Sequence, residues 1–320
     1  MTVIEPISDA ELRANYCLEA VDRVPGDPET TAFKRRARLH QALWREARGL
    51  EIGSQPMRPK TGQSSRPLGS RIAVDVAWES EANFLNEQAR CAVRERVASP
   101  QPHQTLDKER LYCDLLSSMP MCFNLFGVLQ ADLELANRAV HAWWPDVPGR
   151  VRAVHFEWSP GRRLPGEYLE NRSAFDVALE LELEDGGRGV LGVETKYQED
   201  CRAEKPPNDD RRSRYERVTA DSGALKRQSV NAIIGTDLQQ IWLDHLLALS
   251  MAQHPSGEWI WTGFALVHPA GNPSYAKAAE RYRALLGAGA SIRVSTIESL
   301  LAAHALPGQV ATAFTERYLW

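Results

Sequence analysis

This 320-residue sequence lacks long apolar runs, paired cysteine motifs and any large surplus of charge of one sign. No apolar run approaches the roughly 20 residues that span a bilayer, which argues against a transmembrane helix and a membrane partner. The opening Met-Thr-Val-Ile-Glu-Pro has no basic stretch followed by an apolar one, so we expect no signal peptide. A cytoplasmic protein is the simplest interpretation.

The five cysteines are odd in number and form no CxxC motif, so they indicate free thiols and neither a disulfide framework nor a zinc site. With a net charge of −4, the chain as a whole does not attract nucleic acid, and such a partner would have to contact local basic patches. The basic run at 34–38 is interpreted as a solvated helix face, with phosphate contact as the alternative. Further arginines gather at 211–217.

Apolar residues make up 43% of the chain and charged residues 25%, the balance of an ordinary soluble globular protein. Apolar spacing of three to four residues predicts helices, and strict alternation predicts strands. Helices are predicted at about 30–50, 79–97, 131–144, 237–253, 273–286 and, broken near Pro307, 297–320. Strands are predicted at 151–158, within 173–198, at 259–268 and at 291–295. Residues 52–71, rich in Pro, Ser, Gly and Arg, are expected to form an irregular loop.

From residue 131 onward the predicted order is a helix, three strands, a helix and a strand, followed by further helix and strand. This order is typical of an α/β core in which a meander is followed by a crossover connection. We therefore expect a core at 126–320 and a mainly helical N-terminal region at 1–125 beside it.

Residues 173–198 read as two strands around a glycine turn, and they hold the acidic and basic side chains on which a functional hypothesis rests. Asp176 lies near the start of the first strand, and Glu194-Thr195-Lys196 ends the second. Side chains alternate along a strand, so Glu194 and Lys196 share one face. An ionised lysine beside two carboxylates is a recurring arrangement for activating water next to a divalent metal. The alternative is a half-exposed hairpin with solvated charges.

Asp176 reaches the face of Glu194 only if the loop between the strands has an odd number of residues. A three-residue loop at 185–187 meets this condition and supplies a glycine for the left-handed position that such loops need. It pairs Ala178 with Glu194, which makes Asp176 and Glu194 diagonal neighbours, roughly 5–8 Å apart at Cβ. That span suits one metal held between two carboxylates.

In this order, Asp176 and the Glu194-Thr-Lys196 motif resemble the PD-(D/E)XK nuclease superfamily, in which an acid opens one strand and E-x-K lies on the next. The sequence is also similar to a bacterial branch of that superfamily, in the stretches 115–127, 156–162 and 172–176. The similarity runs from about residue 31 to the end of the chain. One departure is Phe175, which stands where the motif name places a proline.

The resemblance implies a restriction-endonuclease-like fold, with a mixed central sheet flanked by helices. It also implies metal-dependent hydrolysis of phosphodiester bonds, with DNA favoured over RNA, Mg²⁺ as the cofactor and Mn²⁺ as its substitute. Asp176 and Glu194 would ligate the metal, with the backbone carbonyl of Thr195 as a further ligand. Lys196 would orient or deprotonate the attacking water and stabilise the phosphorane charge.

The resemblance bears on three more residues, Glu157, Gln240 and His245. Glu157 is the natural extra carboxylate for a second metal or a metal-bound water, and the alternative is a surface acid or a partner for Arg162. Gln240 lies early on the helix after the hairpin, where many superfamily members place a glutamine that points into the site. His245, among apolar residues of the same helix, is interpreted as a hydrogen-bonded core histidine and not as a ligand.

The resulting hypothesis is a DNA endonuclease that acts on foreign or mobile DNA, with bacterial defence as an analogy from the superfamily. A catalytically silent nuclease-like module that binds nucleic acid or a protein is the alternative. A nuclease that needs a protein partner is a third hypothesis, and a homodimer stays open.

Overall fold

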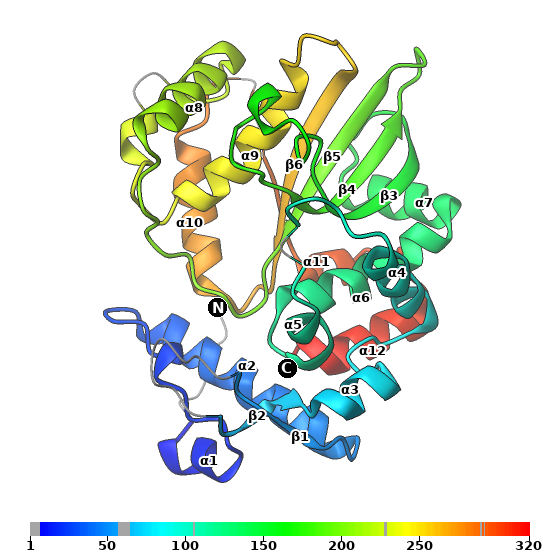
Figure 1. The fold of residues 1–320 in the computed structure, drawn as a ribbon, viewed down its shortest axis with the longest axis vertical. Coiled ribbons are helices and arrows are strands. Elements are labelled where there is room, and N and C mark those ends of the chain that lie inside the picture. The colour runs from blue at the N-terminus through cyan, green and yellow to red at the C-terminus, as the bar shows by residue number, and fades with distance from the viewer. Residues whose placement is uncertain (1–6, 57–64, 105, 227–228, 289, 291) are drawn as a thin grey trace.

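The computed structural model describes residues 7–56, 65–104, 106–226, 229–288, 290 and 292–320. A five-stranded sheet runs through its centre, with helices on both faces (Figure 1). Its strands lie in chain order, β3 (Arg150–Trp158), β4 (Phe175–Glu182), β5 (Arg188–Thr195), β6 (Trp259–His268) and β7 (Arg293–Thr296). Strands β3 to β5 form an antiparallel meander, whereas β5, β6 and β7 are parallel. This mixed sheet confirms the predicted α/β, restriction-endonuclease-like architecture.

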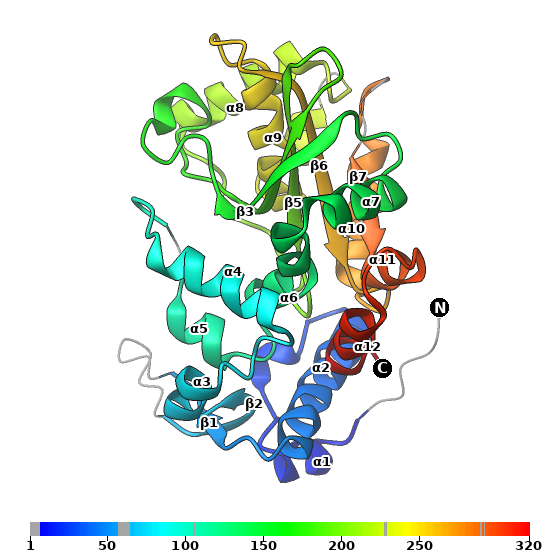
Figure 2. The same cartoon turned by 90° about the vertical axis from the view of Figure 1, so that its right-hand side faces the viewer.

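Each face of the sheet is covered by its own set of helices (Figures 1 and 2). One face packs against α8 (Asp209–Ser222), α9 (Gln239–Ala252) and α10 (Pro273–Ala284). The other face packs against α6 (Ser118–Ala131), α7 (Leu133–Trp143), α11 (Ile297–Ala302) and α12 (Gly308–Tyr318). Both faces are therefore shielded from water, as expected of a sheet with parallel strands.

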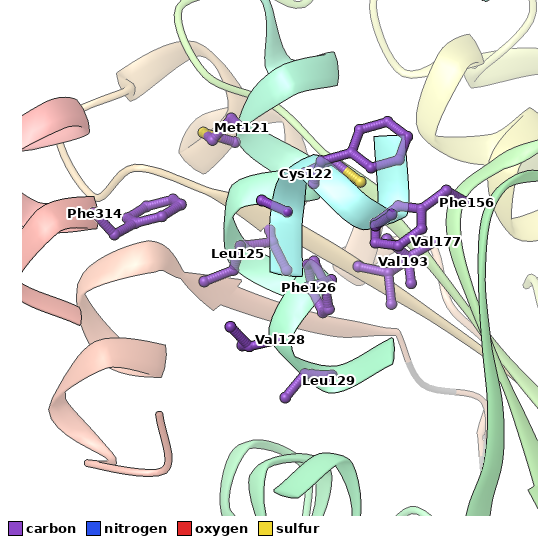
Figure 3. Close-up of a cluster of buried hydrophobic side chains, with 14 of the residues drawn as sticks. Met121, Cys122, Leu125, Phe126, Val128, Leu129, Phe156, Val177, Val193 and Phe314 are labelled. Carbon is purple, nitrogen blue, oxygen red and sulfur yellow. The ribbon is translucent and has the colours of Figure 1, made fainter. Parts of the chain in front are cut away.

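Helix α6 is the most deeply buried helix next to the meander. Its apolar side chains meet Phe156, Val177 and Val193 of the sheet, and Phe314 of α12 lies beside them (Figure 3). One polar residue of this helix, Asn124, is fully buried. Its amide accepts a hydrogen bond from the Leu85 N–H and donates to the Asn83 carbonyl and the Tyr318 hydroxyl, at 2.8–2.9 Å. Asn124 thereby joins three separate segments, which offsets the cost of burying an amide.

The N-terminal region is mainly helical, as predicted. Its elements are α1 (Asp9–Ala14), α2 (Pro28–Ala47), β1 (Ile52–Ser54), β2 (Pro67–Ile72), α3 (Val74–Ser80), α4 (Glu87–Ala98) and α5 (Lys108–Cys113). Short 3₁₀ helices occur at η1 (Ala20–Asp22), η3 (Pro165–Glu167) and η4 (Ser229–Ala232). The division at residue 125 stays a prediction, and α6 runs across that position. No helix in the described part of the chain combines the length and apolar character needed to cross a bilayer.

Three expectations for the N-terminal region were wrong in part. The predicted helix 79–97 is two helices, because Glu81 takes a left-handed φ of +50° and Asn86 caps a new helix start. The predicted loop 52–71 contains the antiparallel strands β1 and β2, and its residues 57–64 lie outside the described ones. The basic run 34–38 is not a solvated face, because Lys34 and Arg38 are buried in ion pairs with Asp200 and Asp22.

The β4–β5 loop is odd, as predicted, but its register differs by two residues. Ala178 pairs with Gly192 and not with Glu194. The loop is 184–186, closed by a 2.8 Å hydrogen bond from the Leu183 N–H to the carbonyl of the residue after the loop. Gly186 has a φ of +79° and takes the left-handed position at the end of this loop, so the turn lies one residue earlier than expected.

Because the shift is two residues, no side chain changes face. The last pair at this end of the ladder is Val177 with Val193. One step beyond it, Asp176 stands opposite Glu194 and not diagonal to it. The register therefore brings the two carboxylates closer together than the predicted pairing does.

Gly192→Ala tests the close packing next to these carboxylates. A Cβ at residue 192 would lie 2.3 Å from a ring carbon of the buried Phe175, so the ring would have to move. We expect the free energy of unfolding, measured in urea, to fall by about 1–3 kcal/mol. Gly308→Ala is the matched control, since no described atom lies within 4 Å of its added Cβ. Equal losses in the two variants would contradict the packing argument.

Candidate active site

A cavity of about 360 Å³ collects side chains from β3, β4, the end of β5 and α9. Its wall contains all five predicted functional side chains, Glu157, Asp176, Glu194, Lys196 and Gln240. Further wall residues are Arg110, Ser118, Met119, Arg172, Ser173, Ala174 and Asp244. The chain thus brings together residues that lie up to 134 positions apart, from Arg110 to Asp244.

Asp176 is oriented by the strand opposite. Its Oδ2 accepts hydrogen bonds from the backbone N–H of Thr195, at 2.8 Å, and from the Thr195 hydroxyl, at 2.7 Å. Burial raises the pKa of Asp176, while Lys196 opposes that shift. In the described part of the chain, no protein donor contacts the other oxygen, Oδ1, so it is left for a ligand of the cavity.

Glu194 and Lys196 form an ion pair in which Nζ lies 2.5 Å from Oε1, and both side chains are about nine-tenths buried. The backbone N–H of Lys196 donates to Val267 in β6, which extends the parallel ladder past the end of β5. Burial and the neighbouring Asp176 raise the pKa of Glu194. Burial alone would lower the pKa of Lys196, but the charge of Glu194 outweighs it and the pKa lies above its usual range. The direction of this shift favours the ammonium form of Lys196.

Glu157, the second-last residue of β3, has an unusual backbone conformation, with a φ of +49°. Its carbonyl accepts hydrogen bonds from Arg162 and Arg96, and its Oε2 lies 3.6 Å from Nη2 of Arg162. Burial and the neighbouring Asp176 raise its pKa to about 7. The carboxylate is buried, lines the cavity and also pairs with Arg162, so it is not a surface acid.

Helix α9 contributes two side chains, one turn apart. Gln240 accepts a 3.1 Å hydrogen bond from the Tyr275 hydroxyl, which holds its amide at the cavity. Asp244 was missed by the sequence reasoning. Its distance of four residues from Gln240, which puts both side chains on one helix face, was the available signal. Burial raises the pKa of Asp244 to about 7 against the opposing effect of Lys196.

The cavity holds more acid than base. Four carboxylates line it, with one buried lysine and the exposed arginines Arg110 and Arg172. Carboxylate oxygens are the ligands that Mg²⁺ prefers, and a cation would offset their mutual repulsion. Within the described ranges, no three or more His, Cys, Asp or Glu side chains are arranged as a ready metal cage. Magnesium sites commonly use only one or two carboxylates with waters, so the donor set fits this ion.

A mixed α/β sheet with an acid and an E-x-K motif at one end of its meander defines the class of protein. Comparison with known families agrees with this assignment, because the model of the PD-(D/E)XK nuclease superfamily matches residues 27–320. The chain belongs to the PD-(D/E)XK nuclease superfamily, whose general activity is phosphodiester hydrolysis by nucleases. No curated protein and no solved structure shows a significant match.

His245 is a core residue, as predicted, and does not belong to the described wall of the cavity. It is 4% exposed, its Nδ1 lies 3.0 Å from the Tyr282 hydroxyl, and its ring stacks near Phe264. Burial lowers the pKa of its imidazole to about 4. The folded protein therefore keeps this ring neutral at pH values where an unfolded chain protonates it.

This depressed pKa predicts a loss of stability in acid. The unfolded imidazole binds a proton below about pH 6.5 and the folded one only near 4, so the stabilisation is complete above 6.5 and is lost as the pH falls to 4. The loss amounts to about 3 kcal/mol. His245→Asn should flatten this part of a plot of unfolding free energy against pH, whereas the exposed His304→Asn should keep the wild-type slope. Identical slopes in both variants would count against a buried neutral imidazole.

Proposed function

We propose that this protein is a metal-dependent DNA endonuclease. The observation that carries the proposal is the convergence of Asp176, Glu194 and Lys196 in one cavity, with Thr195 hydrogen-bonded to the first of them. The superfamily to which the chain belongs supports phosphodiester hydrolysis in general. DNA as the substrate, and foreign or mobile DNA as its biological source, extend that general activity and remain proposals of their own.

We assign Mg²⁺ to Asp176 and Glu194, with the Thr195 carbonyl as a third ligand and Glu157 as the side chain for a second ion or a metal-bound water. Mn²⁺ would replace it. When bound, such an ion polarises the phosphate and lowers the pKa of water. The acidic excess of the cavity and the raised pKa values of its carboxylates support this assignment. Both indicate that a bound cation would stabilise the ionised carboxylates.

Lys196 acts in this proposal as a cation. Its raised pKa favours orienting the attacking water and stabilising charge on the phosphorane over taking a proton. Gln240, held by the Tyr275 hydroxyl, presents its amide to the water or to a phosphate oxygen. Arg110 and Arg172, on the same wall, are suited to contact neighbouring phosphates.

A catalytically silent module that binds nucleic acid or a protein is the alternative. The presence of Asp176, Glu194 and Lys196 together in one cavity argues against it. The oligomeric state, whether homodimer or complex with another protein, is a separate matter that the cavity does not address.

Lys196→Ala tests the mechanism. We expect cleavage of supercoiled and linear DNA in Mg²⁺ to slow by about 10²–10³-fold, the usual loss when one charge-stabilising group is removed. Lys277→Ala, at an exposed lysine paired with Glu29, should cleave at the wild-type rate. EDTA should abolish cleavage in both. Unchanged cleavage in Lys196→Ala would contradict the mechanism, and wild-type binding without cleavage of DNA or RNA would favour the silent module.

Metal binding is tested separately by thermal unfolding. We expect Mg²⁺ or Mn²⁺ to raise the Tm of the wild type, because an ion at 100 times its Kd adds about 2.7 kcal/mol to the stability of the folded state. Asp176→Asn and Glu194→Gln should lose most of this shift, since each removes a ligand. Glu134→Gln, at an exposed acid paired with Arg150, should retain it. A shift of equal size in all variants would place the ion elsewhere.

A further inference from the structure

A second cavity, of about 250 Å³, lies along β3 beside the candidate active site. Its wall includes Arg96, Arg162, His155, Trp158 and Ser99. Glu157 lines this cavity and the candidate active site alike, so the two spaces adjoin at one residue. We call it the β3 cavity. The roles proposed above, metal binding and water activation, belong to the candidate active site, and none of them involves the β3 cavity.

Arg162 has hydrogen-bonding capacity in the β3 cavity that the protein does not use. The side chain is only 4% exposed, and Nη2 donates to the Glu157 carbonyl. Its Nε is fully buried and has no partner among the described residues. The hydroxyl of Ser159, on the same wall, is likewise buried without a partner. Donors left in this state cost free energy, which is recovered only when an acceptor reaches them.

The β3 cavity also holds two buried guanidinium groups, matched in number by the carboxylates of Glu95 and Glu157. Arg96 and Arg162 are both buried, and within the described ranges Glu157 is the carboxylate that pairs with Arg162. Each of the three nitrogens of Arg96 already donates to a backbone carbonyl, of Phe156, Ser99 or Glu157. The wall's other acid, Glu95, is exposed. An anion with several oxygens fits this combination of free donor and charge.

Two half-buried aromatic side chains also line the wall. His155 and Trp158 are half-buried, and their rings stack with centroids 6.1 Å apart and 23° between their planes. Exposed aromatic faces are the surfaces on which nucleobases pack, without preference for sequence. A guanidinium with free donors beside aromatic rings thus suits a nucleotide unit, in which a phosphate is joined to a base, better than it suits a bare inorganic ion.

We propose that the β3 cavity binds a phosphate of the substrate strand next to the scissile one, with Arg162 as its donor. This inference rests on the proposed nuclease function and adds a substrate subsite to it. Since Glu157 lies between the cavities, a strand in the active site can continue into the β3 cavity. A phosphate on Arg162 also competes with Glu157 Oε2 for the guanidinium. Binding of the strand therefore releases the Glu157 carboxylate toward the active site.

The test measures binding without cleavage. A fluorescent 20-base-pair DNA duplex is titrated with protein in Ca²⁺, and the Kd is obtained from anisotropy. We expect Arg162→Gln to raise the Kd by about 10-fold or more and to reduce the salt dependence by about one phosphate contact. Arg163→Gln is the matched control, because the neighbouring arginine is exposed and is not part of the described wall. It should change the Kd by less than about twofold.

A second pair of variants leaves Arg162 in place, in case its loss disturbs the fold. Ser99 is exposed and lines the β3 cavity. Ser99→Glu introduces a negative charge at the cavity and should weaken binding several-fold by repelling the phosphate, whereas the isosteric but neutral Ser99→Gln should not. Duplexes with a single uncharged methylphosphonate then locate the contact. One position should weaken binding to the wild type and have no further effect in Arg162→Gln.

The outcomes separate the two proposals. A wild-type protein that binds neither the DNA duplex nor its RNA counterpart contradicts the proposed function itself. Wild-type binding that is unchanged in both Arg162→Gln and Ser99→Glu overturns only the subsite. Equal weakening in Arg162→Gln and Arg163→Gln, with no methylphosphonate position specific to Arg162, also overturns it, because that result reflects general charge and not a built site.

Discussion

The register between β4 and β5 is the constraint on which the candidate site depends. Side chains alternate along a strand, so a slip of one residue would move Asp176 to the face of Val177 and empty the site. The register is held at both ends. Gly186 closes the turn in a left-handed conformation, and at the far end Thr195 donates two hydrogen bonds to Asp176. The hydrogen bonds from Thr195 that orient the Asp176 carboxylate therefore also join β4 and β5 beyond the last residue pair of their ladder.

Charged groups can remain in this buried cavity only because the surrounding chain holds them in place. The backbone that leaves β5 is fixed by the N-terminal region, where α2 supplies Gln41 as a donor to the Tyr197 hydroxyl and Lys34 as the partner of Asp200. Asn272, at the start of α10, donates to the carbonyl of Tyr197 from the other side. The helices before residue 125 therefore support the segment that carries Lys196. A core at 126–320 that folded without them would leave this segment free on one side.

The hairpin, the sheet and most helices could be predicted because their signals are local. Alternating side chains mark β4 and β5, and the odd loop follows from the requirement that Asp176 and Glu194 share a face. Long-range features could not be predicted. The basic run 34–38 has the sequence of a solvated helix face, yet Lys34 is buried because Asp200, far along the chain, lies against it. The position of Asp244 in the cavity likewise depends on how α9 packs on the sheet, and only its spacing from Gln240 is visible in the sequence.

Glu157 shows how the two cavities depend on one backbone position. A left-handed φ at a residue with a side chain costs about 1 kcal/mol or more, and a glycine or asparagine would adopt it with less strain. Stability alone gives no reason for a glutamate there. The conformation turns the Glu157 carbonyl to Arg162 and Arg96 while its carboxylate lines the candidate active site. Glu157 thus links the guanidinium groups of the β3 cavity to the carboxylates of the candidate active site. This arrangement suits a polyanion that extends from one cavity into the other better than it suits a fold without a ligand.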